Sequence, residues 1–207
     1  VGLARERRVP VEAHHADAHV NLGIALRMQG KLSDAIMSLR EAVRLEPHHI
    51  EAHYHLGFAL AADQRLNEAI ESFRETVRLK PNHAEAHLYL GATLAAAGRP
   101  EEAVESFRGV LVLNPDHAAA YVYLGNISVD LGRMEEAVAS YRQALQRQPN
   151  DPETLNNLGN TLSELDRKDE AIAAYRQALE ANPRYFQACH NLGLAHLDRR
   201  NAEEAVA

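Results

Sequence analysis

Residues 50–83 read IEAHYHLGFALAADQRLNEAIESFRETVRLKPNH, and this stretch decides the fold because the chain repeats its pattern every 34 residues. A Leu56-Gly57 pair is followed twelve residues later by Ala69, and Pro81 closes the unit. Glycine recurs in the same register at positions 23, 57, 91, 125, 159 and 193. A period of about 20 to 50 residues indicates one supersecondary element per unit, stacked on its neighbours. We therefore expect a repeat protein, a class that binds other molecules and seldom catalyses.

Apolar residues within the unit recur at three- and four-residue steps, which predicts two helices joined by a short bend. Gln64 and Arg65 occupy the bend in this repeat, and glycine occupies it in sister repeats at Gly30, Gly98 and Gly132. Glycine takes the left-handed conformation that ends many helices. Proline at 47, 81, 115, 149 and 183 is expected to stop each second helix.

Capping residues are also predicted from the pattern. The second helices are expected to begin with a polar cap such as Ser33 or Asn67, or with Pro100 in the first turn. Residues directly after the closing prolines are expected to cap the next first helix, namely Asn82, Asp116 and Asn150. Glycine in mid-helix costs about 1 kcal/mol relative to alanine. We therefore expect Gly57 to face Ala69, so that the two helices approach closely.

Composition limits the function classes. The formal net charge is −7, which gives no basic surface of the kind that binds nucleic acid. Cys189 is the single cysteine, so the chain has no internal disulfide, the compartment stays open, and a cytoplasmic location is favoured. No apolar run approaches the ~20 residues of a membrane span. Because the chain begins at Val1 and stops inside a repeat at Ala207, we expect the natural protein to be longer.

The combination of Leu56-Gly57, Ala69, Phe73 and Pro81 resembles the signature of the tetratricopeptide repeat (TPR) family. The resemblance covers about residues 16–207. It implies an all-α fold, an α-solenoid of helix-turn-helix TPR hairpins that forms a superhelix. The expected repeats are 16–49, 50–83, 84–117, 118–151, 152–185 and a truncated 186–207, preceded by an irregular segment or degenerate helix at 1–15. The unbroken period favours one domain.

In TPR proteins the first helices line a concave groove, and the resemblance implies that ligand contacts come from them. The groove is expected to be apolar in the early repeats and rich in amides in the later ones. The predicted ligand-binding residues are Asn21, Tyr54, Phe58, Leu88, Asn126, Asn156, Asn157, Asn160 and Asn191. Amide side chains both donate and accept hydrogen bonds, as a peptide backbone does. The alternative interpretation is that the apolar residues are core and the asparagines a solvated face.

Asparagine stands two positions before the glycine at Asn21, Asn157 and Asn191. This arrangement resembles the asparagine ladder in the TPR repeats of O-linked N-acetylglucosamine transferase, which grips a substrate peptide backbone. The ladder occupies three of six equivalent positions. The resemblance implies an alternative function, a substrate-docking domain of a larger enzyme such as a glycosyltransferase.

Histidine pairs four residues apart are the candidate metal ligands, since such residues share a helix face. They are His49 with His53 and His83 with His87, and we favour a structural role over a native metal site. No phosphate-binding loop, nucleophile elbow or paired-cysteine motif is present, so we expect no catalysis and no cofactor.

The sequence thus predicts a non-enzymatic scaffold that binds a peptide or protein partner in a concave groove. A third hypothesis is a self-assembling structural element that stacks head to tail into filaments. The last repeat is expected to hold only a stub of its second helix, Glu203 to Ala207, which leaves Leu194 and Leu197 without a hairpin partner. Solenoids need polar terminal caps to stay soluble.

Overall fold

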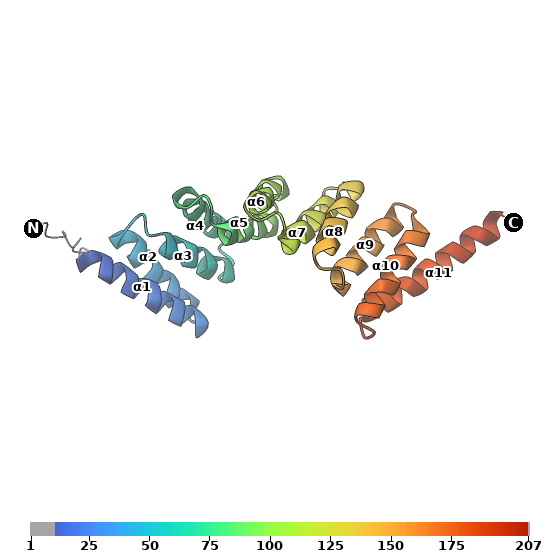
Figure 1. The fold of residues 1–207 in the computed structure, drawn as a ribbon. Helices are drawn as coiled ribbons and strands as arrows, with labels where there is room; N and C mark the ends of the chain where they lie inside the picture. The colour runs from blue at the N-terminus through green and yellow to red at the C-terminus, as the bar shows by residue number, and fades with distance from the viewer. Residues whose placement is uncertain (1–10, 207) are drawn as a thin grey trace, which may run out of the picture. The chain divides into compact units, whose positions relative to one another are not determined.

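The computed structural model describes the backbone of residues 11–206 and the side chains of residues 15–197. Within those residues all regular structure is α-helical (Figure 1). The helices are α1 (Val11–Met28), α2 (Leu32–Leu45), α3 (Ile50–Ala62), α4 (Leu66–Leu79), α5 (Ala84–Ala96), α6 (Pro100–Leu113), α7 (Ala118–Asp130), α8 (Met134–Arg147), α9 (Pro152–Glu164), α10 (Lys168–Ala181) and α11 (Phe186–Val206). Helix α1 begins five residues before the expected start of the first repeat.

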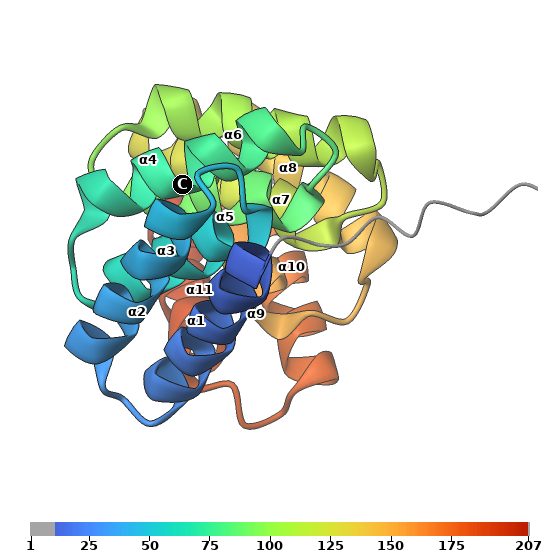
Figure 2. The same cartoon turned by 90° about the vertical axis from the view of Figure 1, so that its left-hand side faces the viewer.

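Consecutive helices pack in pairs, as the repeat pattern predicts. The two helices of a hairpin, such as α3 and α4, lie side by side in both views (Figures 1 and 2). The second helix of one hairpin then packs on the first helix of the next, as α4 does on α5 and α8 on α9. The predicted all-α array of TPR hairpins is therefore confirmed.

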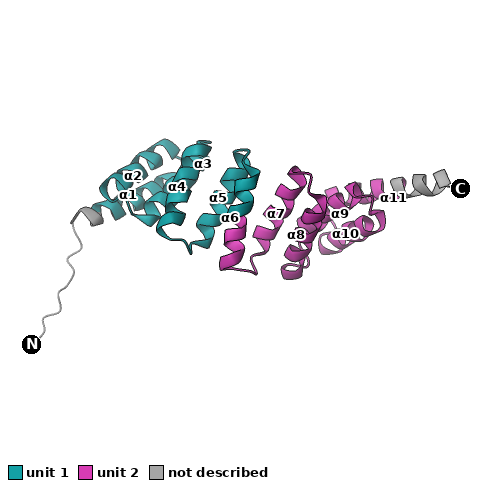
Figure 3. Ribbon diagram, turned by 90° about the horizontal axis from the view of Figure 1, so that it is seen from above, with its two compact units in different colours: residues 1–106 teal, residues 107–207 magenta. Residues whose placement is uncertain are grey.

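The chain divides into two compact units, unit 1 at Val1–Ser106 and unit 2 at Phe107–Ala207 (Figure 3). The boundary falls inside α6. Each unit has a core of small side chains interleaved with one large residue from each second helix. Phe73 fills this role in unit 1, and Tyr141 and Tyr175 fill it in unit 2. The expectation of a single domain stays a prediction.

The bends have the backbone geometry that the sequence predicts. One residue in each bend has a positive φ, and these residues are Gly30, Gln64, Gly98, Gly132 and Asp166. The second helices end at Leu45, Leu79, Leu113, Arg147 and Ala181, two residues before each proline. Proline cannot continue a helix and disfavours helical geometry in the residue before it.

The capping predictions are wrong for the first helices and for Ser33 and Asn67, whereas α6 begins at Pro100 as expected. The first helices are capped by the second residue after the proline, and the side chains of His49, His83, His117 and Asp151 accept from the backbone N–H three residues on. Prolines 47, 81, 115 and 149 and the residue after each lie in the turn, so the cap comes one position later than expected. Second helices follow basic residues, such as Arg65, that make no side-chain cap. Arg65 instead pairs with Glu68 in the first turn, which leaves Asn67 exposed.

The periodic glycine does not face the alanine as expected. A Cβ built on Gly57 would lie 2.7 Å from Cε1 of Phe73, and one on Gly159 would lie 2.4 Å from Cε1 of Tyr175. The glycine therefore makes room for the large ring four residues after the alanine. An aromatic ring needs more space than the methyl group of Ala69, which explains why glycine and not alanine fills this position.

Arginines on the second helices pair with glutamates on the second helix of the next repeat. Arg40 pairs with Glu68 at 2.5 Å, Arg74 with Glu102 at 2.7 Å, and Arg142 with Glu170 at 2.7 Å, each 28 residues apart. Arg74 also pairs within its own helix, with Glu71 at 2.9 Å. Each of these exposed ion pairs contributes little to the stability of the fold.

The end of the array departs from the predicted partial hairpin. Helix α11 runs without a bend from Phe186 to Val206. The position equivalent to the bend residues Gly132 and Asp166 is Arg200 in this repeat, and no glycine or proline follows it. The sequence therefore gives the chain no reason to leave the helix there.

Candidate functional site

The first helices of unit 1 present a cluster of aromatic side chains. The Tyr54 ring lies 4.9 Å from the ring of Phe58, and Phe58 lies 4.3 Å from Tyr89, both edge to face. Phe73 from α4 supports them from the core, with its centroid 5.5 Å from that of Phe58. The predicted residues Tyr54 and Phe58 are thus brought together. Tyr89 joins them unpredicted, and the half-buried Leu88 lies beside it in sequence.

A cation and a half-buried histidine accompany this aromatic cluster. The Arg27 guanidinium lies 5.6 Å from the centre of the Phe58 ring, a distance at which the ring attracts a cation. Burial lowers the pKa of His55. The negative charge of Glu51 raises this pKa, whereas the positive charge of Arg27 lowers it further. Buried nitrogens of Arg27 and His55 have no hydrogen-bond partner within the described part of the chain. The predicted Asn21 is exposed on α1.

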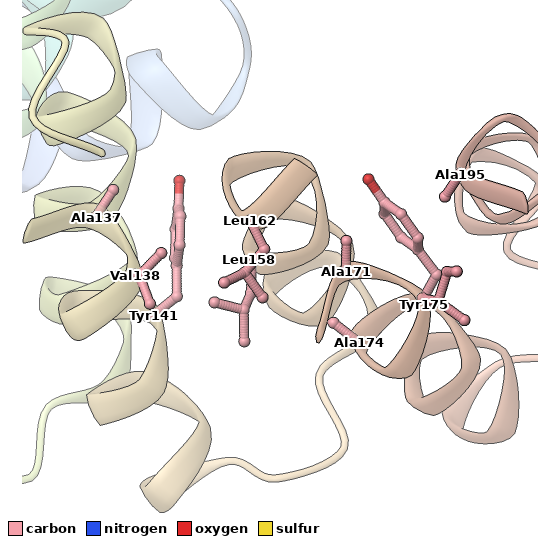
Figure 4. Packing of buried hydrophobic residues seen from close by; sticks show 10 residues of the cluster. Ala137, Val138, Tyr141, Leu158, Leu162, Ala171, Ala174, Tyr175 and Ala195 are labelled. Atoms are coloured by element: carbon pink, nitrogen blue, oxygen red, sulfur yellow. The ribbon is translucent and has the colours of Figure 1, made fainter. Parts of the chain in front are cut away.

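Unit 2 replaces these aromatic contacts with pairs of tyrosine and asparagine. The Tyr141 hydroxyl donates to Oδ1 of Asn126 at 2.7 Å, and the Tyr175 hydroxyl donates to Oδ1 of Asn160 at 2.8 Å. Figure 4 shows both rings standing among aliphatic residues, with Leu158 and Leu162 between them and their hydroxyl groups directed to the same side of the cluster. Because each hydroxyl holds the amide oxygen, the amide nitrogen is fixed in orientation as well.

A third amide links the first helices α9 and α11. Nδ2 of Asn191 donates to Oδ1 of Asn156 at 3.0 Å and to Oδ1 of Asn160 at 2.9 Å. Asn156 is only 5% exposed, so it supports this network from the interior and does not present its amide at the surface. Asn157 makes no such contact, and its half-buried amide is available to a ligand.

Two pockets of closely similar make-up lie over this amide network. The first has a volume of about 360 Å³, and its lining includes Asn126, Asp130, Tyr141, Asn157, Asn160 and Glu164. The second has a volume of about 350 Å³, and its lining includes Asn160, Glu164, Tyr175 and Asn191. The amide, acid and tyrosine residues of the first pocket have equivalents of the same type one repeat later, in the second pocket. We call them the amide pockets.

Burial keeps the tyrosine hydroxyls protonated. It raises the pKa of Tyr141 to about 12, with a smaller contribution from the negative charge of Asp130. It likewise raises the pKa of Tyr175 to about 12, helped by Glu164. Both hydroxyls therefore remain donors at neutral pH. The amides, which do not titrate, can bind a backbone over a wide range of pH.

The residues predicted from the sequence include Asn126 and Asn160 but not the tyrosines that bond to them. Tyr141 and Tyr175 each stand 15 residues after one of these asparagines. The equivalent pair in unit 1 is Phe58 and Phe73, in which neither partner is polar. This joint change from phenylalanine to tyrosine and asparagine is the signal in the sequence that identifies the pairing.

The four histidines that are candidate metal ligands form hydrogen bonds with the backbone. The rings of His49 and His83 cap α3 and α5 through Nδ1, while Nε2 of His53 and His87 bonds the carbonyl oxygen of Pro47 and Pro81. Among the residues with described side chains, no group of three or more histidine, cysteine, aspartate or glutamate side chains could hold a metal ion.

Comparisons with known proteins agree with this architecture. A family model described as the cilia and flagella-associated protein 70 C-terminal domain matches residues 3–207. A search of curated proteins found no match. Over the described residues, no helix is both long enough and apolar enough to cross a membrane.

Solved TPR structures resemble the chain in fold. A crystal structure of the MamA protein is 24% identical with a TM-score of 0.78, covering 82% of this chain and 92% of its own. MamA 41-end from Desulfovibrio magneticus RS-1 is 23% identical with a TM-score of 0.77, covering 83% and 97%. YrrB, described as a TPR protein with an unusual peptide-binding site, is 20% identical with a TM-score of 0.73, covering 83% and 89%.

Proposed function

The chain belongs to the family of cilia and flagella-associated protein 70 C-terminal domains, and from this premise we propose that it is a non-catalytic scaffold that holds an extended segment of a partner protein. The observation that carries the proposal is the pair of amide pockets in unit 2. Their amides offer donors and acceptors in fixed positions, and an extended backbone needs both.

The structure of the pockets favours recognition of backbone over recognition of a small molecule. Tyr141 and Tyr175 occupy the oxygens of Asn126 and Asn160, which leaves the amide nitrogens as donors. Asn157 contributes both a donor and an acceptor to the first pocket. Repetition of the same pocket one repeat later suits a ligand that itself repeats, as a polypeptide backbone does.

Unit 1 offers a partner a different kind of surface. Tyr54, Phe58 and Tyr89 provide apolar ring surface with Arg27 beside it. Aromatic residues with an arginine are enriched among the residues that dominate protein interfaces. We propose that this cluster binds apolar side chains of a partner protein. The family description names cilia and flagella, which we propose as the setting in which the chain works.

The test uses the whole chain as bait against a displayed library of random twelve-residue peptides, followed by affinity measurement on a selected peptide. Asn157→Ala should weaken binding roughly threefold to tenfold, since one net hydrogen bond contributes about 0.5–1.5 kcal/mol. Asn150→Ala changes an exposed asparagine outside both pockets and is the matched control. Equal affinities for these two variants, or no selected peptide, would refute the proposal.

Exchanging Asn126, Asn157 and Asn160 together for alanine is a less clean test of whether the pockets bind a peptide. It would leave the buried Tyr141 and Tyr175 hydroxyls without acceptors, at a cost of about 1–3 kcal/mol each. Tyr141→Phe with Tyr175→Phe is better, because it keeps all the amides and removes only the hydroxyl donors, so that Asn126 loses this bond and Asn160 keeps its bond from Asn191. Weaker peptide binding with unchanged helical circular dichroism is the expected result.

Self-association is a second candidate, favoured by the exposed apolar side chains of α11. Phe186 is 79% exposed, Leu194 48% and Leu197 57%. A head-to-tail contact that does not close produces an open filament. Light scattering that grows with concentration, and stops growing in Leu194→Glu with Leu197→Glu, would support it; a strict monomer at high micromolar concentration would exclude it. The remaining hypothesis is a substrate-docking domain of a larger enzyme. In that case the same pockets would hold the substrate of a catalytic domain elsewhere in the protein.

A further inference from the structure

Two first helices of unit 2, α7 and α9, carry charge of only one sign. Helices α7 and α9 contain Asp130, Glu153 and Glu164 but no lysine or arginine. Arginines of the second helix α8 have other partners: Arg142 pairs with Glu170 at 2.7 Å, and Arg147 lies 4.6 Å from the centre of the Tyr121 ring on α7. One-sided charge of this kind raises the local concentration of an oppositely charged ligand and speeds its approach.

Two of these acids lie in the amide pockets without a cationic partner. Asp130 lines the first pocket, and Glu164 lines both. The neighbouring Arg167 is engaged with Glu170 at 2.7 Å and with Glu135 at 3.1 Å. Neither Asp130 nor Glu164 forms an ion pair with any residue whose side chain the structure describes. Each carboxylate thus stands beside a fixed amide and a tyrosine hydroxyl, ready to accept hydrogen bonds.

The chemistry of the pockets limits which kind of positively charged ligand they can bind. The pockets are lined by only two carboxylates, and among the described side chains no group of three or more could hold a metal ion. The same carboxylates repel phosphate, which excludes nucleic acid. Lysine and arginine side chains of a peptide match the carboxylates by charge-assisted hydrogen bonds, while the amides hold the backbone between them.

We propose that the amide pockets select an extended peptide segment with two basic side chains, one directed to Asp130 and the other to Glu164. The inference rests on the proposed function, because it presupposes that the pockets hold a polypeptide backbone. It adds specificity to that function: the amides supply affinity for any extended segment, and the carboxylates discriminate by charge.

The test compares peptides and protein variants in one matrix. A peptide selected from the random library is synthesised in its original form and with each lysine or arginine changed to glutamine. Affinities are measured by fluorescence anisotropy for the wild-type chain, for Asp130→Asn with Glu164→Gln, and for Glu46→Gln with Glu180→Gln. The last variant removes two exposed charges outside both pockets and has the same net charge as the pocket variant.

The expected result is enrichment of basic residues among the selected peptides. The pocket variant should bind the original peptide about threefold to tenfold more weakly at low salt, with a smaller difference at roughly 0.5 M salt. The glutamine peptide should bind both variants alike, and the control should behave as the wild type. Equal loss in the pocket and control variants would overturn the proposal and assign the effect to net charge.

The remaining outcomes separate this inference from the proposed function. If uncharged and basic peptides bind equally, and Asn157→Ala still weakens both, the pockets hold a backbone without selecting charge, and the present inference is wrong. If Asn157→Ala has no effect on any peptide, the proposed function itself fails. Circular dichroism of every variant confirms that changes in affinity do not come from unfolding.

Discussion

The two units build the same hairpin but make different surfaces from it. In the second repeat, which lies in unit 1, the residue after the repeat glycine is Phe58, and it packs edge to face on Phe73, 15 residues later. Unit 2 places Asn126 and Asn160 at that position, and each accepts from a tyrosine 15 residues later. One hydroxyl group added to the core ring therefore goes with a change of the first-helix surface from aromatic to amide. The comparison links the identity of a core residue to the chemistry of the first-helix surface above it.

The largest expected effect tests what both units share, the space that glycine leaves for the ring. Gly159→Ala places Cβ 2.4 Å from Cε1 of Tyr175, which is only 3% exposed, so the ring has to move. We expect the free energy of unfolding to fall by about 1–3 kcal/mol. Gly57→Ala should behave alike against Phe73. Urea denaturation measures both.

Gly193→Ala is the matched control for this change. It lies in the same register of the repeat, yet apart from its own helix backbone no atom of the described residues lies within 4 Å of its built Cβ. Its free energy of unfolding should therefore stay unchanged or rise by up to about 1 kcal/mol, because alanine favours the helix more than glycine. A similar loss at Gly159 and Gly193 would show that helix geometry, and not ring packing, requires the glycine.

The second prediction transfers the pairing of unit 2 into unit 1. Phe73→Tyr alone should destabilise by about 1–3 kcal/mol, because its buried hydroxyl meets Phe58 and finds no acceptor. Adding Phe58→Asn supplies the acceptor. We expect the double variant to be more stable than the sum of the single changes by about 0.5–1.5 kcal/mol in a double-mutant cycle. Strict additivity would mean that the pairing depends on more than these two positions.

The third prediction concerns alkaline pH. A tyrosine in the unfolded chain ionises near a pKa of about 10, whereas burial raises the pKa of Tyr141 and Tyr175 to about 12. The unfolded state loses its protons first, so this contribution to stability is complete below about pH 10 and disappears as the pH rises toward 12. The melting temperature should fall over that interval.

Tyr141→Phe with Tyr175→Phe should flatten this decline. Some dependence should remain, because burial also raises the pKa of Tyr54 in unit 1 to about 12. A decline of equal steepness in the double variant and the wild type would mean that the unit 2 tyrosines are not its source.

The smallest effect concerns the caps of α7 and α9 within unit 2. His117 and Asp151 occupy equivalent positions, and each accepts from a backbone N–H, at 3.2 Å and 3.1 Å. Aspartate is among the strongest capping residues and also favours the positive end of the helix dipole. We expect His117→Asp to raise the free energy of unfolding by roughly 0.5 kcal/mol and Asp151→Ala to lower it by about 1 kcal/mol. A loss on His117→Asp would indicate that the imidazole packs as well as caps.

Much of the fold follows from local patterns in the sequence. The 34-residue period, the alternation of helix and bend, and the prolines after the second helices all act through backbone geometry within a few residues. Helix boundaries and the left-handed bend at Gly30, Gly98 and Gly132 are therefore readable without a structure. The same is true of the amide-rich character of the later repeats, because it depends only on which residues are present.

Tertiary packing decided which side chains meet. Asn156 lies in the interior while its neighbour Asn157 lines a pocket, because adjacent residues on a helix point about 100° apart and the packing of α9 sets which side is covered. Gly57 faces Phe73 and not Ala69 for the same reason. The sequence by itself determined the repeat, its helices and its chemistry, which are local. The helix contacts determined the faces, because rotation of a helix about its axis is fixed only by what it packs against.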